Sequence, residues 1–223
     1  MDILGTMARR SFIKTTVAAA VTTSATAGLL SIPNACVGGG TLDERDNVIG
    51  PRGGYSPQVG TLLSMMTWMR NAIIGPLKEI TVQQLDYLHD ENSNSIGSML
   101  LHLAAMERYY QIHTLEGKQW GDWSNKDKSR FDIAMNLGAE AREKIKGNNI
   151  DFYLTTLKEV REMTIKEFKN RDDKWLQSVD ENWFWGPTNN YCKWFHVCEH
   201  ESNHNGQIKY IKSRAPGGKD NKD

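Results

Sequence analysis

Hydrophobic residues recur every three or four positions in four long stretches of the chain, which begin near residues 56, 93, 149 and 189. This spacing is typical of amphipathic helices that bury one face. The first stretch opens with Ser56-Pro57, a favourable N-cap followed by proline at the first helical position. No stretch alternates with a period of two for long enough to predict a strand. The pattern therefore predicts an all-α domain over residues 56–213, an antiparallel four-helix bundle.

Two finer features follow from the same pattern. A shorter amphipathic stretch over residues 126–146 predicts one extra helix. In the second long helix, His102 lies on the apolar face, whereas Glu107 and Arg108 are expected to point away from the core. The last residues, 214–223, are rich in Gly, Lys and Asp and predict a disordered tail.

The N-terminus has the order of a targeting segment. Arg9-Arg10 precede Ser11-Phe12-Ile13-Lys14, which resembles the twin-arginine export signal, and a mild apolar run rich in small residues follows. This order predicts a removable signal peptide over residues 1–35 and a flexible linker over residues 36–55. The predicted location is periplasmic or extracellular.

Two other fates of this segment are weighed against export. A transmembrane anchor is disfavoured, because the apolar run is diluted with Thr and Ser and is shorter than the roughly 20 apolar residues that a span needs. Residues 33–36 loosely resemble a lipoprotein box, so a lipid anchor at Cys36 is the alternative. The box lacks the usual leucine, which makes it the weaker interpretation.

Composition excludes several classes of protein. The 223 residues contain 27 basic and 27 acidic side chains, so the net charge is zero and no basic excess points to nucleic acid. Three cysteines are too few for a disulfide framework. No nucleic-acid partner is expected, and a homodimer is a candidate assembly.

The histidines carry the clearest chemical signal. His196, His200 and His204 are four residues apart on the last predicted helix, so they share the face that enters the core. Burying several imidazoles without partners would cost a few kcal/mol each. A divalent metal ion that takes one lone pair from each neutral ring removes this cost.

Two ligands on one helix do not complete a site. His102 is the best third ligand because it lies on the apolar face of the second helix, although a lone histidine there would more often be a hydrogen-bonded core residue. The sequence thus predicts one divalent ion held by His102, His200 and His204. Zinc or nickel fits this ligand set best, with iron or manganese as alternatives.

Three other interpretations use the same residues. His200-Glu201-Ser202-Asn203-His204 matches the HExxH pattern of zinc proteases, but the short remaining chain holds no histidine or glutamate for a third ligand. Glu201 and His204 also form one Glu-x-x-His step of a di-iron bundle, and the second step is missing from the sequence. A purely structural role of the histidines stays open.

Two segments resemble one known family. Residues 94–104, which contain His102, resemble the second-helix motif of the DinB/YfiT-like proteins, and residues 196–208 resemble their fourth-helix motif. The resemblance covers roughly residues 56 to 213. It implies a four-helix bundle that binds a divalent metal through three histidines, which correspond by position to the same three ligands. It also implies that His196 and Gln207 lie beside the ligands, while the change of the family's usual His and Arg to Asn203 and Asn205 puts any chemistry tied to them in doubt.

The resulting functional expectation is an exported metal-binding protein with an unknown small-molecule substrate. Three protein ligands leave a fourth position open, which predicts an enzyme that activates water or a thiol, as a hydrolase or a thiol-S-transferase. Glu201 is the candidate proton carrier, with a solvated surface glutamate as the alternative. Export argues against the thiol version, because low-molecular-weight thiols are concentrated in the cytosol. The rival class is a non-enzymatic bundle that the metal stabilises.

Overall fold

The computed structural model describes residues 47–218, and these residues confirm the all-α class. The helices are α1 (Pro57–Ile74), the 3₁₀ turn η1 (Gly75–Leu77), α2 (Val82–Leu85), α3 (Ile96–Thr114), α4 (Asn125–Asn136), α5 (Gly138–Lys144), α6 (Ile150–Phe168), α7 (Asp173–Gln177) and α8 (Asn190–Arg214). Within the same residues, the sheet is one antiparallel pair, β1 (Val179–Asp180) and β2 (Thr188–Asn189). None of the described helices is both long and apolar enough for a membrane crossing.

The predicted signal peptide, Cys36 and the first part of the predicted linker lie outside the described residues. Export and lipidation therefore stay predictions. Within the described part of the linker, residues 47–55 lie along α1. Trp68 Nε1 donates a hydrogen bond to Asn47 Oδ1 (3.1 Å), and the backbone N–H of Gly50 donates to Ser64 Oγ (3.1 Å).

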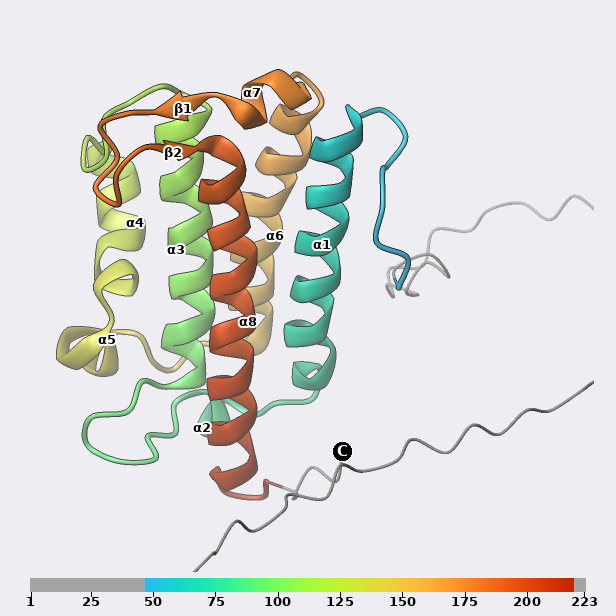
Figure 1. The fold of residues 1–223 in the computed structure, drawn as a ribbon. Helices are drawn as coiled ribbons and strands as arrows, with labels where there is room; N and C mark the ends of the chain where they lie inside the picture. The colour runs from blue at the N-terminus through green and yellow to red at the C-terminus, as the bar shows by residue number, and fades with distance from the viewer. Residues whose placement is uncertain (1–46, 219–223) are drawn as a thin grey trace, which may run out of the picture. The chain divides into compact units, whose positions relative to one another are not determined.

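The four long helices α1, α3, α6 and α8 lie side by side (Figure 1). Gly97 faces Tyr153 at the starts of α3 and α6, and Gln111 bonds to Thr164 near their ends, so these two helices run in parallel. By contrast, α3 and α8 run antiparallel, since Thr114 at the end of α3 accepts a hydrogen bond from the indole of the early α8 residue Trp194. The prediction that neighbours alternate in direction is therefore wrong for α3 and α6. The segment with α4 and α5 packs along α3 and returns the chain to the starting end.

Side-chain caps explain where most long helices begin. In three of the four long helices the N-cap side chain accepts the backbone N–H three residues later, and these caps are Ser95, Asn149 and Asn189. The shorter helices α2, α4 and α7 have the same kind of cap. The start of α1 differs. Ser56 Oγ donates to Asp173 Oδ1 (2.6 Å). Asp173 Oδ1 also accepts the backbone N–H groups of Gln58 (2.9 Å) and Val59 (3.3 Å). A residue of α7 therefore caps α1 and ties the two helices together.

The extra helix expected over residues 126–146 is two helices, α4 and α5, broken at Leu137. Leu137 has φ 53° and ψ −151°, a backbone conformation that residues other than glycine rarely adopt. In an unbroken helix the N–H of Gly138 would bond to the carbonyl of Ala134. Here it bonds to Asn94 Oδ1 (3.1 Å), so the Ala134 carbonyl accepts only the longer bond from the N–H of Leu137 (3.3 Å) and can accept a second donor.

Each long helix contributes one buried charged side chain to a central ion cluster, which consists of Arg70, Glu107, Arg161 and Glu201. Glu107 Oε2 pairs with Arg70 (2.8 Å) and its Oε1 pairs with Arg161 (2.8 Å). Glu201 Oε1 pairs with Arg161 (2.8 Å) and with Arg70. The prediction that Glu107 points away from the core is wrong, because its exposed fraction is 0%. Two positive and two negative charges cancel, so the cluster as a whole is neutral.

The carboxylate of Glu107 is stabilised in its ionised form. Burial alone would raise its pKa, but the charges of Arg161 and Arg70, with a hydrogen bond from Thr164 Oγ1 (2.6 Å), lower it to about 2. The guanidinium groups also donate to the backbone, from Arg161 to Met66 O (3.0 Å) and from Arg70 to Leu157 O (3.2 Å). The cluster thus satisfies most of its buried polar atoms, which is the condition for keeping charges inside a core.

We expect Glu107→Gln to destabilise the fold by about 3–5 kcal/mol, since removal of one partner leaves buried positive charge uncompensated. Urea unfolding followed by circular dichroism measures this. The control is Glu159→Gln, which breaks the exposed pair with Arg130 and should cost less than about 1 kcal/mol. A loss as small as in the control would show that the cluster does not stabilise the fold.

The same carboxylate predicts a pH dependence. The folded pKa of Glu107 lies below its ordinary value of 4.5, so its contribution to stability is present above that value and is lost as the pH falls toward about 2. The wild-type protein should therefore lose stability between these two pH values, and Glu107→Gln should show a smaller loss over the same range. Parallel urea titrations at each pH would detect it, and equal slopes for both proteins would contradict the assignment.

Candidate metal centre

Three imidazole rings meet between α3 and α8, from His102, His200 and His204. His200 Nε2 lies 2.8 Å from His102 Nε2 and 3.2 Å from His204 Nε2. All three ligand atoms lie within 4.8 Å of one another. His102 and His204 are buried and His200 is half-buried, so the group is open to solvent on one side. The helix geometry predicted this meeting point, and it is confirmed.

The orientation of His102 follows from the break between α4 and α5. Its Nδ1 donates a hydrogen bond to the carbonyl of Ala134 (3.0 Å), the group that the break at Leu137 leaves available. An imidazole that donates through Nδ1 has its lone pair on Nε2, and this nitrogen faces the other two rings. The strained residue therefore has a consequence at the site, because it supplies the acceptor that selects the ligand form of His102.

The surroundings favour neutral rings. Burial lowers the pKa of His102, lowers that of His200 to about 3, and lowers that of His204 to about 4. The neighbouring rings lower the pKa of His200 and His204 further, since a second positive charge nearby is unfavourable. Neutral imidazole is the form that binds metal ions. Three neutral rings whose Nε2 atoms converge on one point therefore fit a bound cation.

The spacing also fits a transition-metal ion. Two nitrogens bound to one zinc at about 2.0–2.1 Å in tetrahedral geometry are about 3.3 Å apart. The two short separations here, 2.8 and 3.2 Å, are about 0.5 and 0.1 Å below that value. Three nitrogen ligands leave a fourth position for a small molecule. The residues present therefore fit a divalent ion with an open coordination position.

His196 and Gln207, expected beside the ligands, lie at different places around the three rings. The His196 ring lies 5.4 Å from the His200 ring, so it borders the group without entering it. Its Nδ1 is 3.3 Å from the Glu199 carboxylate. Gln207 is exposed, and hydrogen bonding to it raises the pKa of His204 against the stronger effect of burial. Both residues are neighbours of the site.

Glu201, expected as a proton carrier, has different partners. Its Oε1 is held by Arg70 and Arg161 in the central ion cluster, and its Oε2 is buried without a hydrogen-bond partner. The exposed fraction of Glu201 is 1%, so it is not the solvated glutamate of the alternative interpretation either. Its location supports a structural role beside the site.

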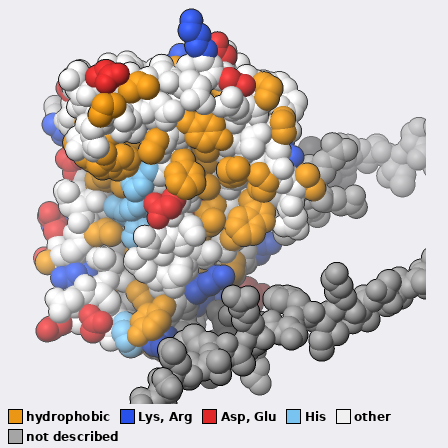
Figure 2. Space-filling model, viewed as in Figure 1, with side chains coloured by type: hydrophobic (Ala, Val, Ile, Leu, Met, Phe, Trp, Pro, Cys, Tyr) orange, Lys and Arg blue, Asp and Glu red, His pale blue; other side chains and the backbone are white. Residues whose placement is uncertain are grey.

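Aromatic side chains border the histidines on one side. The Trp185 ring lies 5.0 Å from the His196 ring, and Tyr110 lies 6.0 Å from it. In the face of the molecule seen in Figure 2, histidine side chains reach the surface beside a group of hydrophobic side chains. The sequence offered only the tryptophan content of two loops as a signal for this surface, because the ring contacts join segments far apart in the chain.

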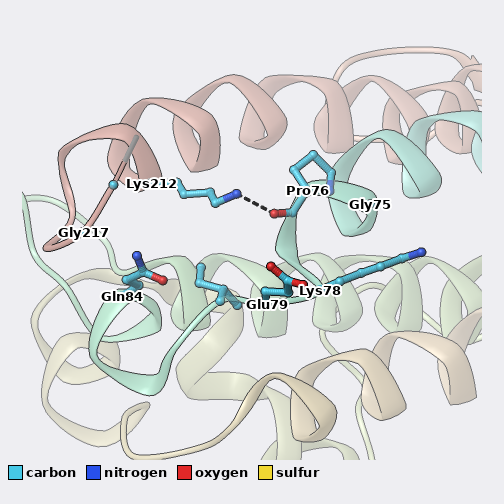
Figure 3. A pocket seen from close by; sticks show the side chains of 9 residues that line it. Gly75, Pro76, Lys78, Glu79, Gln84, Lys212 and Gly217 are labelled. Atoms are coloured by element: carbon cyan, nitrogen blue, oxygen red, sulfur yellow. Dashed lines mark hydrogen bonds between the residues drawn. The ribbon is translucent and has the colours of Figure 1, made fainter. Parts of the chain in front are cut away.

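The cavity drawn in Figure 3 lies away from the histidines, at the end of the molecule where α1 turns into η1. Lys212 of α8 reaches across it and donates to the carbonyl of Pro76 (2.5 Å). Gln84 of α2 lines it and donates to the carbonyl of Pro216 (3.1 Å), so the start of the predicted tail packs against α2. Of the residues that line this cavity, Glu79 alone is of a type that commonly binds divalent metals, so the lining does not form a metal site.

Comparison with models of known protein families identifies the family of this chain. A family model described as mycothiol-S-transferase matches residues 61–217, which is more than half of the 223-residue chain. The chain therefore belongs to the mycothiol-S-transferase family. This family lies within the DinB/YfiT-like superfamily, so the resemblance of the two histidine motifs is confirmed. No curated protein matches the sequence.

We expect His204→Ala to lower the affinity for zinc by more than about 100-fold, because changes that merely disturb the orientation of a ligand already cost about 10- to 100-fold. The matched control is His196→Ala on the same helix, which should change the affinity by less than about tenfold. Competition with a chromogenic chelator measures both affinities. Similar losses in the two variants would place His196 among the ligands and contradict the assignment.

Proposed function

We propose that this protein is a divalent-metal-dependent S-transferase that joins a low-molecular-weight thiol, mycothiol or a similar one, to an electrophilic small molecule. The observation that carries the proposal is the convergence of three imidazole Nε2 atoms in a member of the mycothiol-S-transferase family. On the same grounds we assign the four long helices to a four-helix bundle of the DinB/YfiT type. Zinc or nickel is the preferred ion, with iron or manganese as alternatives.

The residues of the chain have separable roles in this proposal. His102, His200 and His204 would hold the ion, and the Ala134 carbonyl keeps the His102 ring in its ligand form. A divalent ion bound there would lower the pKa of a thiol in the open position, so that a sulfur nucleophile is available near neutral pH. The half-buried side of His200 leaves a path for the thiol from solvent. No described carboxylate joins the three rings within ligand distance, so the proton of the thiol is expected to leave to solvent.

Export through the twin-arginine route is part of the proposal and rests on residues 8–14 and the apolar run after them. Export and the thiol chemistry make opposing demands, because low-molecular-weight thiols are concentrated in the cytosol, so an exported S-transferase would depend on thiol that is present outside the membrane. Replacing both Arg9 and Arg10 by lysine should keep the protein inside the cell with residues 1–35 uncleaved. Unchanged export of this variant would contradict the proposed route.

Cobalt substitution tests the thiol directly. The protein loaded with Co²⁺ should develop a sulfur-to-metal charge-transfer absorption when mycothiol is added, since the open position accepts the sulfur. The control is the same molecule without its thiol group, which should leave the spectrum unchanged.

Two outcomes would contradict the proposal. If the thiol leaves the cobalt spectrum unchanged while activated esters are hydrolysed, water is the nucleophile and the protein is a hydrolase. If neither occurs and chelation sharply lowers the melting temperature, the ion stabilises a non-enzymatic bundle.

A further inference from the structure

The loop between β1 and β2 carries three consecutive aromatic residues, Trp183, Phe184 and Trp185. The exposed fraction of Trp183 is 5%, whereas those of Phe184 and Trp185 are 63% and 48%. Large aromatic side chains that stay together in solvent are typical of binding surfaces. The first ring is therefore part of the core, and the other two are displayed on its surface.

The base of this loop is firmly attached. Lys193, whose exposed fraction is 1%, donates to Asp180 Oδ2 (2.7 Å), and its ammonium group lies 4.2 Å from the centre of the Trp183 ring. The backbone N–H of Asn190 donates to the carbonyl of Ser178 (3.1 Å). These contacts hold the loop in one position, which reduces the ordering cost of binding a ligand.

A tight turn sets the direction of the two exposed rings. The N–H of Gly186 donates to the carbonyl of Trp183 (2.8 Å), and Gly186 has φ 94°. This backbone conformation is strained for any residue with a side chain. Glycine at this position therefore allows Phe184 and Trp185 to project from a turn that is closed beneath them.

The exposed rings are continuous with the three histidines. Only the His196 ring separates Trp185 from His200, at centroid distances of 5.0 and 5.4 Å. On its other side His196 faces Tyr110 (6.0 Å), which contacts Trp120 (5.1 Å). Aromatic rings from separate segments thus extend from the exposed Trp185 to the buried Tyr110 beside the histidines. Figure 2 shows hydrophobic side chains next to histidine side chains on this face of the molecule.

A cavity lies beyond the histidines in the other direction along α8. Gln207 of α8 and Asn94 of the loop before α3 supply amide groups to its lining, while Met99, Tyr210 and Ile211 supply apolar surface. The lining is therefore mixed, which distinguishes this cavity from the exposed aromatic rings on the other side of the histidines.

We propose that Phe184 and Trp185 determine specificity for the electrophilic substrate, and that this substrate is a planar aromatic molecule. This inference rests on the proposed function and names its second substrate class. Offset stacking on exposed rings favours such a molecule over an aliphatic one of equal size. In the reaction, the sulfur forms a bond to the substrate carbon, the leaving group departs with the electron pair of its former bond, and the thiol proton passes to solvent.

Binding is tested with 4-nitrobenzyl alcohol, an unreactive planar probe, by isothermal titration of the full chain. Trp185→Ala should weaken binding by about tenfold, and Trp185→Phe by less than about threefold because it keeps a ring. The control is Phe152→Ala, which removes a ring of 43% exposure from α6 and should bind the probe as the wild type does. Equal binding by wild type and Trp185→Ala, or no binding by the wild type, would overturn the inference.

Turnover of 4-nitrobenzyl chloride with mycothiol separates this inference from the proposed function. Trp185→Ala should raise KM for the chloride about tenfold and leave KM for the thiol unchanged. Turnover with an unchanged KM for the chloride would overturn the aromatic site alone. Probe binding that depends on Trp185 without any turnover would support the site and overturn the S-transferase.

Sedimentation of both proteins tests the competing occupant, a second copy of the chain. The inference predicts the same oligomeric state for wild type and Trp185→Ala. If the substitution dissociates a dimer, the two rings belong to a subunit interface and the inference is overturned.

Discussion

Four buried charged side chains, one from each long helix, pair with one another at the centre of this protein. A buried guanidinium or carboxylate without its partner costs several kcal/mol, so this requirement limits how far any helix can slide along its neighbours. Glu107 follows His102 by little more than one turn of α3, and Glu201 is adjacent to His200 on α8. The register that pairs both carboxylates with Arg70 is therefore also the register in which His102 meets the histidines of α8.

Much of this could be predicted from the sequence, because periodicity and capping act locally. The spacing of hydrophobic residues located the long helices, and the four-residue spacing of His200 and His204 located half of the site. What local rules could not supply is the partner of a buried charge. Glu107 looks like a surface residue until Arg161 of another helix is placed beside it. The available signal was an arginine on an otherwise apolar stripe, as at Arg70.

Two other features of the structure differ from the sequence prediction because they depend on contacts between distant segments. The break at Leu137 opposes local propensity, since leucine is a good helix former. Its consequence lies on another helix, because the ring of His102 donates a hydrogen bond to the carbonyl of Ala134 next to the break. The parallel course of α3 and α6 depends on where the connecting segment packs, and hydrophobic periodicity carries no information about helix direction. Sequence patterns thus identified faces of helices, while the relations between helices needed the structure.

The three histidines adjoin two surfaces. Aromatic rings lie on one side of them, and a cavity with both polar and apolar lining lies on the other. The central ion cluster bears on the site through the helices, since Arg161 pairs with Glu107 of α3 and with Glu201 of α8, the two helices that carry the three histidines.

X-ray absorption spectroscopy of the zinc-loaded, substrate-free protein tests the central claim most directly. Three imidazole nitrogens at about 2.0–2.1 Å and one further light ligand are expected around the zinc ion. Fewer than three imidazoles, or a cysteine sulfur at about 2.3 Å, would contradict the central claim.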